Sequence, residues 1–357
     1  MLILVDLKKI FNKRNVVIFS VLVGFLALWY LFSIISINDV MAAFKGATLE
    51  LIFYYVLIQI GLMSVMTIRW KIILKSQGID NVGLFRLNNY RLVGQAVSFI
   101  TPAAKLGGEP VRAALLSSKE GIPFNKSLSG VVIDKTLEVS TSFAFFIIGS
   151  IIMLFSFVIS PNFTYLIVGL SIVFLFFLIL FNYRVMRGKH FFLTFFQLIK
   201  LSKLKSLKKF MKTVKEFELL IIRFYHKDRK YFLYAVLISL VGWILMFFEY
   251  DLAAKMVGHN LSILQIFLVF TFVGAAYLVP VPMALGALEA GQVSLFSMIK
   301  ISTAAGLALS LIIRMKDMIF AAIGLILLVI FGLNFKDAVN DSGYLDKEVE
   351  KLKKDEE

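Results

Sequence analysis

Cysteine is absent from this 357-residue sequence, and histidine occurs only three times. Without cysteine the chain forms no disulfide, offers no thiol nucleophile and has no sulfur ligand for a metal. The histidines are widely separated, and we expect each of them to be a loop residue: His190, His226 and His259. The sequence therefore predicts no metal site and no cofactor.

The common catalytic motifs are missing as well. The sequence contains no Gly-x-x-x-x-Gly-Lys-Ser/Thr loop, no His-Glu-x-x-His pair and no Gly-x-Ser-x-Gly turn. ATP hydrolysis, zinc chemistry and serine hydrolysis are thus unsupported. We expect no enzyme activity and assign no catalytic residue.

Charged residues are scarce, at 17% of the sequence, while hydrophobic residues reach 59%. A transmembrane helix needs about 20 mostly apolar residues, because the hydrocarbon core is about 30 Å thick and each residue rises about 1.5 Å. Six stretches qualify as spans: residues 16–37, 51–68, 131–159, 163–181, 231–248 and 307–335. We predict an all-α, multi-pass integral protein of the cell membrane.

Lysine and arginine give the chain a net charge of +15. This charge does not predict a nucleic-acid partner, because the basic residues gather in segments that would face one side of a bilayer. The N-terminus, residues 69–91 and residues 184–230 are basic, whereas the segments that would face the other side hold few basic residues: 38–50, 160–164 and 254–262. The positive-inside rule then predicts cytoplasmic N- and C-termini. The apolar run after the basic N-terminus is too long for a signal peptide and is expected to be a retained first helix.

The basic segment 184–230 has apolar residues at three- or four-residue spacing: Phe210, Val214, Phe217, Ile221 and Phe224. Such a stripe beside lysines predicts an interfacial amphipathic helix that attracts anionic lipid headgroups at the cytoplasmic face. The simpler alternative is a cytoplasmic loop that only sets topology. We expect residues 1–335 to form one membrane domain, followed by a charged cytoplasmic tail at 336–357.

Two further apolar stretches, at about 84–116 and 263–299, are interrupted by proline, glycine and charge. In the first, Pro102 precedes Glu109 by seven residues; in the second, Pro282 precedes Glu289 by the same distance, 180 residues later. The predicted spans make the unit at about 51–159 enter the membrane from outside and the unit at about 231–335 from inside. We therefore predict an inverted repeat of six spanning helices plus two re-entrant hairpins, as in transporters.

The hairpin tips are expected to meet across a polar crevice. The residues expected to shape the tips are Pro102, Gly107, Gly108, Pro280, Pro282 and Gly286. The alternatives are ordinary interfacial loops, or pairs of full spans that proline kinks.

Ionisable residues lie in and beside these hairpins, where a charge at the bilayer centre costs about 2.5–3.5 kcal/mol unless it is paired or functional. The candidate substrate-binding residues are Lys105, Glu109, Arg112, Asp134, Lys135, Glu138, Glu289 and Arg314. Arg112 and Lys105 would receive a phosphate, and the two glutamates would orient these bases or take up protons. The alternative is a set of salt bridges that fix the hairpins to neighbouring helices.

At these residues the sequence resembles the flippase-like membrane region of the lysylphosphatidylglycerol synthase transmembrane family. The resemblance rests on Tyr90-x-x-x-Gly94 before Thr101-Pro102, on Gly107-Gly108-Glu109-x-x-Arg112, and on Pro280-x-Pro282-x-x-x-Gly286-x-x-Glu289 followed by Arg314. It covers about residues 10–335, without the soluble aminoacyl-transferase domain of the longer members. One departure is Asp134-Lys135, where the resemblance leads us to expect an acid–arginine pair; lysine lacks the bidentate fork.

The resemblance implies movement of a phospholipid or polyprenyl-linked headgroup between leaflets, with membrane lipid as the partner and a homo-oligomer as an open possibility. No energy source is visible in the sequence, so transport would be downhill or coupled to protons or to the membrane potential. Two alternatives from other classes stay open. One is a membrane-embedded transferase or phosphatase with Glu109 or Asp134 as general base; the other is a scaffold that binds partners through residues 184–230.

Overall fold

The computed structural model describes residues 36–100, 107–156, 161–198, 208–226, 228–279 and 281–332, together with Trp29 and Ser33. The regular structure in these ranges is helical, and they contain no strand. The predicted all-α class is therefore confirmed. The expected first span at 16–37 lies largely outside the described residues, and the tail at 336–357 lies wholly outside them.

Three of the described helices are long and apolar enough to cross a membrane: α4 (Leu49–Ser76), α7 (Phe124–Ser156) and α11 (Arg229–Met256). They contain most of the predicted spans at 51–68, 131–159 and 231–248. At about 1.5 Å per residue, α4 and α11 are each about 42 Å long, which exceeds the roughly 30 Å of hydrocarbon. These helices therefore tilt or continue beyond the hydrocarbon core.

Two other long helices occupy the remaining predicted spans. Helix α8 (Pro161–Met186) covers the stretch predicted at 163–181, and α14 (Thr303–Phe331) covers most of the stretch predicted at 307–335. Helix α14 carries three charged side chains near its middle: Arg314, Lys316 and Asp317. Such charges inside a long apolar helix call for partners on the neighbouring helices.

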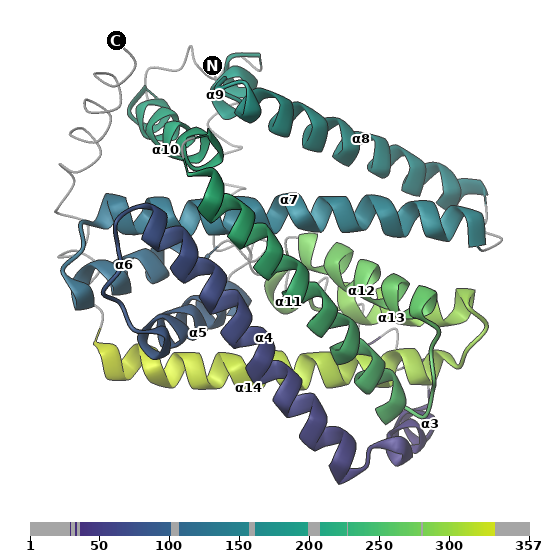
Figure 1. Cartoon of the computed structure of the whole chain (residues 1–357). Helices are drawn as coiled ribbons and strands as arrows, with labels where there is room; N and C mark the ends of the chain where they lie inside the picture. The colour runs from purple at the N-terminus through teal and green to yellow at the C-terminus, as the bar shows by residue number, and fades with distance from the viewer. Residues whose placement is uncertain are drawn as a thin grey trace, which may run out of the picture.

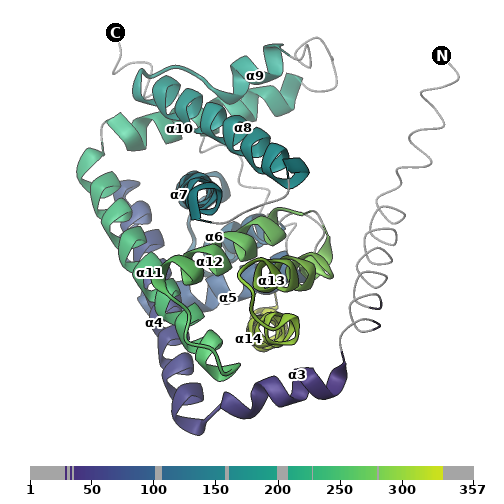
Figure 2. The ribbon, with the colours of Figure 1, turned by 90° about the vertical axis from the view of Figure 1, so that its right-hand side faces the viewer.

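Four shorter helices lie between α7 and α14, and α4 and α11 run along one side of them (Figures 1 and 2). They are α5 (Leu84–Ile100), α6 (Glu109–Glu120), α12 (Ile263–Leu278) and α13 (Ala287–Met298). Helices α6 and α13 have 12 residues each and are thus about 18 Å long, too short to cross the hydrocarbon core alone. The predicted interruptions at 84–116 and 263–299 are therefore real breaks between helices.

The order of helices recurs along the chain. Shifting the bounds of α4 by 180 residues gives the bounds of α11, and the same shift brings α5, α6 and α7 to within a few residues of the starts of α12, α13 and α14. The packing is reciprocal as well, because α5 packs on α14 while α12 packs on α7. Helices α4 and α11 run antiparallel, since Gly46 lies beside Gly258 and Gly61 beside Leu245.

Helix α10 (Lys208–His226) carries the predicted amphipathic stripe, and it packs with α8 and α9 (Phe192–Leu198). Within this stripe, Ile221 and Phe224 are 2% and 1% exposed and lie in a core cluster with residues of α7 and α8. The prediction that the stripe faces lipid is thus wrong at these two positions, because neighbouring helices cover it. The side chains of Phe210, Val214 and Phe217 lie outside the described part.

Buried Glu218 of α10 holds this group of helices together. Its carboxylate accepts hydrogen bonds from the backbone N–H groups of Phe191, Phe192 and Leu193 at the start of α9. These N–H groups have no partner within their own helix. A carboxylate there also interacts favourably with the helix dipole.

Candidate functional site

Asp134 of α7 is the centre of a buried charge network that joins four helices. Its side chain is fully buried and pairs with Arg69 of α4 at 2.8 Å and with Arg112 of α6 at 3.0 Å. Arg91 of α5 reaches the same carboxylate at 3.4 Å. Three arginines thus converge on one aspartate, and through it the first interrupted pair of helices is held to α4 and α7.

Lys135 and Glu138 extend this network along the same helix. Lys135 lies 2.9 Å from Glu138 and 3.4 Å from Glu109 of α6, and Glu138 lies 3.5 Å from Arg69. Lys135 and Glu138 are three residues apart on α7 and therefore share one face of the helix. We call these seven residues the Asp134 network: Arg69, Arg91, Glu109, Arg112, Asp134, Lys135 and Glu138. With four cations and three carboxylates, it carries one surplus positive charge.

Several donors in and beside the Asp134 network have no acceptor. The Nε atom of Arg112 and the Nε1 atom of Trp70 are buried without a hydrogen-bond partner, as is Nη2 of Arg69, which lies at ion-pair distance from Glu138. The guanidinium of Arg112 also lies 4.1 Å from the centre of the Trp70 ring. One acceptor of the network, Oε2 of Glu109, is also buried without a partner. Buried polar atoms are nearly always paired in folded proteins, so these atoms mark positions at which a ligand or water would find a hydrogen-bond partner.

A close crossing of α5 and α6 sets the position of Arg112. A Cβ atom on Gly108 would lie 1.7 Å from the carbonyl oxygen of Gly94, and one on Gly94 would lie 2.3 Å from Cγ of Arg112. Only glycine fits at either position. The backbone N–H of Gly108 donates to Ser98 Oγ at 2.8 Å, which ties the start of α6 to α5. The glycines in the sequence motif therefore permit the approach that places Arg112 beside Asp134.

The second interrupted pair of helices has its own ion pair. Arg314 of α14 lies 2.5 Å from Glu289 of α13, and its Nη1 donates to the carbonyl oxygen of Met283 at 3.0 Å. The other oxygen of Glu289 accepts the N–H of Gly286 at 2.9 Å. The predicted residues Gly286, Glu289 and Arg314 thus lie together and hold η4 (Pro282–Ala284) and α13 to α14.

One helical turn of α14 also binds α11 and α12, and α4 joins through Glu249 of α11. Lys316 lies 2.7 Å from Glu249 of α11 and 3.6 Å from Asp317, and Tyr55 of α4 donates to Glu249 at 3.4 Å. Tyr277 of α12 donates to Asp317. We call these residues, together with Glu289 and Arg314, the Arg314 network. Helix α14 is the centre of this network, as α7 is the centre of the first.

The structure sorts the predicted site residues into these two networks. Glu109, Arg112, Asp134, Lys135 and Glu138 belong to the first, whereas Glu289 and Arg314 belong to the second. The ends of the two helix pairs approach each other, because Met283 packs against a cluster that contains Ala96 and Phe99 of α5. Lys105, Pro102 and Pro280 lie outside the described residues.

Five charged residues of these networks were not among the predicted site residues: Arg69, Arg91, Glu249, Lys316 and Asp317. The sequence offered a signal for two of them. The 180-residue offset that aligns the two hairpins also aligns Arg69 of the first half with Glu249 of the second half. The same offset aligns Asp134 with Arg314. At each of these two aligned positions, the charge in one half is therefore the reverse of the charge in the other half. Arg91 follows no such pattern and is recognisable only from the folded chain, in which α5 packs on α4 and Arg91 reaches Asp134 of α7.

Comparison with known proteins supports an assignment by family. A family model described as the lysylphosphatidylglycerol synthase TM region matches residues 17–334, which include both networks. The chain belongs to this family. As a member of the lysylphosphatidylglycerol synthase TM-region family it is a multi-pass membrane protein, and the resemblance inferred from the glycine, glutamate and arginine motifs is confirmed.

Two archaeal proteins are similar to part of the chain. A UPF0104 membrane protein of Methanothermobacter thermautotrophicus is 30% identical over 118 residues, which is 33% of this chain and 35% of the relative. A UPF0104 membrane protein of Methanocaldococcus jannaschii is 28% identical over 134 residues, or 36% of this chain and 38% of the relative. The match thus spans little more than a third of either relative. No solved structure gives a significant match.

Proposed function

We propose that this member of the lysylphosphatidylglycerol synthase TM-region family moves a phospholipid or lipid-linked headgroup between leaflets. The headgroup would pass through a polar crevice between two re-entrant hairpins, α5–α6 and α12–α13, while the acyl chains stay in lipid. Such a path removes the cost of taking a charged headgroup through hydrocarbon.

The observation that carries this proposal is the surplus of buried donors in the Asp134 network. Four cations face three carboxylates in the network. Nε of Arg112, and Nε1 of the neighbouring Trp70, have no acceptor among the described residues, against one unpaired acceptor, Oε2 of Glu109. A phosphate group offers acceptor oxygens and negative charge, and it suits the planar fork of an arginine. The network is thus suited to an anionic headgroup.

The arrangement of the short helices supports the re-entrant path. Helices α6 and α13 are too short to span, and all four short helices lie between α7 and α14, as Figure 2 shows. Non-helical backbone at membrane depth is tolerated where protein surrounds it or where it lines a cavity. At the second interruption, η4 packs against α5 and α12 and so meets the first condition.

The inverted repeat is supported by the antiparallel pairing of α4 with α11 and by the reciprocal packing of α5 on α14 and α12 on α7. Two equivalent helices that run antiparallel are related by a two-fold rotation axis perpendicular to both helices. That axis would lie in the membrane plane, as in transporters with inverted-topology repeats. Each half then contributes one ion network and one hairpin to the path.

A lipid-scrambling assay tests the proposal. The purified protein is reconstituted in phosphatidylcholine vesicles with a trace of fluorescent phosphatidylglycerol, and the fraction that an external quencher reaches is followed over time. We expect Arg112→Lys to slow scrambling about tenfold, because lysine keeps the charge but loses the fork. Arg86→Lys is the matched control, since the Arg86 side chain is 65% exposed and pairs with Glu120.

The measurement has two results that contradict the proposal. One is an equal scrambling rate in vesicles with the wild-type protein and in protein-free vesicles. The other is an equal scrambling rate for Arg112→Lys and Arg86→Lys, provided that both variants unfold at the same temperature as the wild type. The same vesicles also test the transferase or phosphatase alternative, because a chemically altered lipid on chromatography would favour an enzyme. Transport remains the better supported function, since the oxygens of Asp134 already accept from three arginines.

A further inference from the structure

Trp70 of α4 is a buried aromatic residue whose hydrogen-bond donor is unused. Its side chain is 0% exposed, and its Nε1 atom has no partner among the described residues. The face of its ring lies against Arg112, with 4.1 Å between the guanidinium carbon and the ring centre. An indole N–H lies in the plane of the ring and can only donate. A group that binds beside Trp70 must therefore supply an acceptor.

Arg112 adds a second unused donor next to Trp70. Its Nη2 donates to Asp134 at 3.0 Å, whereas its Nε has no partner among the described residues. The Arg112 side chain is 6% exposed, so bulk water does not satisfy this donor. A phosphodiester has two unesterified oxygens that share one negative charge, and phosphate oxygens are strong acceptors for arginine. One such group offers an acceptor to each donor, and its charge equals the single surplus charge of the Asp134 network.

Glu109 supplies the opposite polarity on the same side of α6. Its Oε1 lies 3.4 Å from Lys135, while its Oε2 is buried without a partner. Glu109 and Arg112 are three residues apart on α6 and therefore share one face of the helix. The free carboxylate oxygen calls for a donor, whereas Nε of Arg112 calls for an acceptor. A ligand that satisfies both residues must carry both kinds of group.

We propose that the Asp134 network binds an anionic phosphodiester lipid whose headgroup carries hydroxyl groups, and that Trp70 and Glu109 determine this specificity. The inference rests on the proposed function, because it names the class of lipid taken by the same site. The phosphate oxygens would accept from Nε1 of Trp70 and Nε of Arg112. A headgroup hydroxyl would donate to Oε2 of Glu109.

Other common headgroups satisfy the site less well. Choline carries no hydrogen-bond donor, so Oε2 of Glu109 would stay unpaired. Ethanolamine has donors, but its ammonium charge cancels that of the phosphate and leaves the surplus charge of the network in place. A phosphomonoester can carry a second negative charge, which exceeds the surplus. A hydroxylated diester meets the donors, the acceptor and the charge together.

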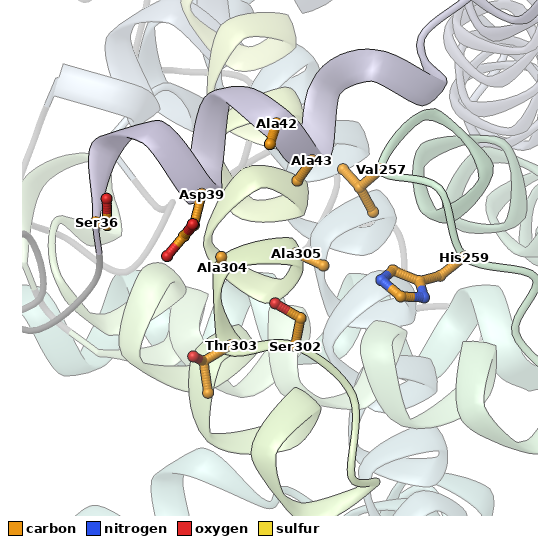
Figure 3. Close-up of a pocket in the computed structure, with 10 residues that line it drawn as sticks. All are labelled: Ser36, Asp39, Ala42, Ala43, Val257, His259, Ser302, Thr303, Ala304 and Ala305. Atoms are coloured by element: carbon orange, nitrogen blue, oxygen red, sulfur yellow. The ribbon is translucent and has the colours of Figure 1, made fainter.

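A pocket near the start of α4 is a competing place for a headgroup (Figure 3). It has a volume of about 370 Å³ and lies between α3 (Ile37–Ala43), the connection after α11 and the start of α14. Asp39, His259 and Ser302 are among its lining residues, and their side chains are exposed or half-buried. Helix α4 begins shortly after α3 and rises about 30 Å before it reaches Trp70. The pocket is therefore distinct from the Asp134 network, and filling it provides a control.

Calorimetric titration of the full chain in dodecyl maltoside micelles with dioctanoyl lipids tests the proposal. We expect phosphatidylglycerol to bind about tenfold more tightly than phosphatidylcholine or phosphatidylethanolamine, as for one hydrogen bond to a charged group. Trp70→Phe keeps a ring against Arg112 but removes the N–H, and it should weaken phosphatidylglycerol binding about tenfold. Trp243→Phe is the matched control, because Trp243 lies on α11 against Phe145, and it should leave binding unchanged.

Two further variants keep the test specific to the site. Glu109→Gln raises the positive charge felt by every phosphate, so its readout is the ratio of phosphatidylglycerol to phosphatidylcholine affinity, which should fall about tenfold. Glu120→Gln, on the same helix but paired with Arg86, should leave this ratio unchanged. Ala42→Trp fills the pocket of Figure 3 from an exposed position and should also leave binding unchanged.

Four results overturn the proposal. They are equal wild-type affinity for phosphatidylglycerol and phosphatidylcholine, equal affinity for phosphatidylglycerol and phosphatidylethanolamine, unchanged binding in folded Trp70→Phe, and loss of binding in Ala42→Trp. The first two need no variant, so they hold even if a substitution prevents folding.

Dioctanoyl phosphatidylinositol distinguishes the two sources of a hydroxylated headgroup. Tighter binding than phosphatidylglycerol indicates a ring polyol or sugar, and weaker binding indicates glycerol; both results support the site. Binding in micelles does not measure transport. Selective binding without scrambling in vesicles would thus contradict the proposed function alone, whereas scrambling without headgroup selectivity in binding would contradict this inference alone.

Discussion

Replacing Asp134 with asparagine should have the largest effect on stability of any conservative change in the first network. The carboxylate is fully buried and accepts from arginines at 2.8, 3.0 and 3.4 Å. Asparagine has nearly the same shape, so the change removes charge without opening a cavity. The surplus of the network then rises from one positive charge to two in a buried site.

The expected loss is about 3–5 kcal/mol of unfolding free energy, the usual cost of breaking a buried ion pair by removing one partner. The matched control is Asp251→Asn, which breaks a pair with Lys255 whose side chains are 23% and 40% exposed. That pair lies four residues apart on a helix, where a loss of about 0.3–0.5 kcal/mol is typical. The two variants should therefore differ roughly tenfold in their cost.

Unfolding by titration with sodium dodecyl sulfate in mixed micelles measures both values. A double variant, Asp134→Asn with Arg112→Gln, adds a second test, because removing one cation relieves part of the surplus. Its loss should fall short of the sum of the single variants by roughly 0.5–3 kcal/mol. Equal losses for Asp134→Asn and Asp251→Asn, or strict additivity in the double variant, would refute a buried network centred on Asp134.

Three other changes test separate parts of the molecule. Gly108→Ala should prevent the close crossing of α5 and α6 and lower the yield of folded protein. Gly169→Ala, whose added Cβ would meet nothing within 4 Å, should be neutral or stabilising by up to about 1 kcal/mol in the detergent titration. Lys316→Met should cost about 3–5 kcal/mol in the detergent titration, since it leaves buried Glu249 without its cation. Glu218→Gln should increase hydrogen exchange of the amides at the start of α9 at least tenfold, because they lose a charged acceptor; unchanged exchange there would contradict this role.

The order of helices was readable from the sequence because long apolar runs leave few alternatives. The apolar stretches near 51, 131, 231 and 307 predicted α4, α7, α11 and α14, although the helix bounds differ by several residues. Proline and glycine marked the two interruptions, since neither continues a helix readily. Glu109 and Glu289 were recognisable because a charge in an apolar run is costly and therefore rarely incidental.

The partners of these charges were not readable from the sequence. Arg69 pairs with Asp134 across 65 residues of chain, and Lys316 pairs with Glu249 across 67. Such pairs form because helices distant in sequence pack side by side, and a side chain's nearest neighbours then depend on how each helix is rotated. Glu109 accordingly pairs with Lys135 rather than orienting Arg112, which pairs with Asp134 instead.

For the amphipathic stripe of α10, the sequence likewise predicts the helix but not what covers its apolar face. Its spacing predicted a helix with one apolar face, and the helix is present, but a stripe alone does not say whether lipid or protein covers it. Ile221 and Phe224 lie against α7 and α8 because those helices are close enough to bury them.

By itself, the sequence determined that this chain is an all-α membrane protein with two interrupted segments and charges inside apolar stretches. Those features follow from hydrophobicity, helix length and the conformational limits of proline and glycine, which act locally along the chain. Only the tertiary structure decided that three arginines share Asp134, that α14 joins a second network, and that Asp39 and His259 line one pocket. These contacts join distant segments, and their geometry is set by how the helices pack.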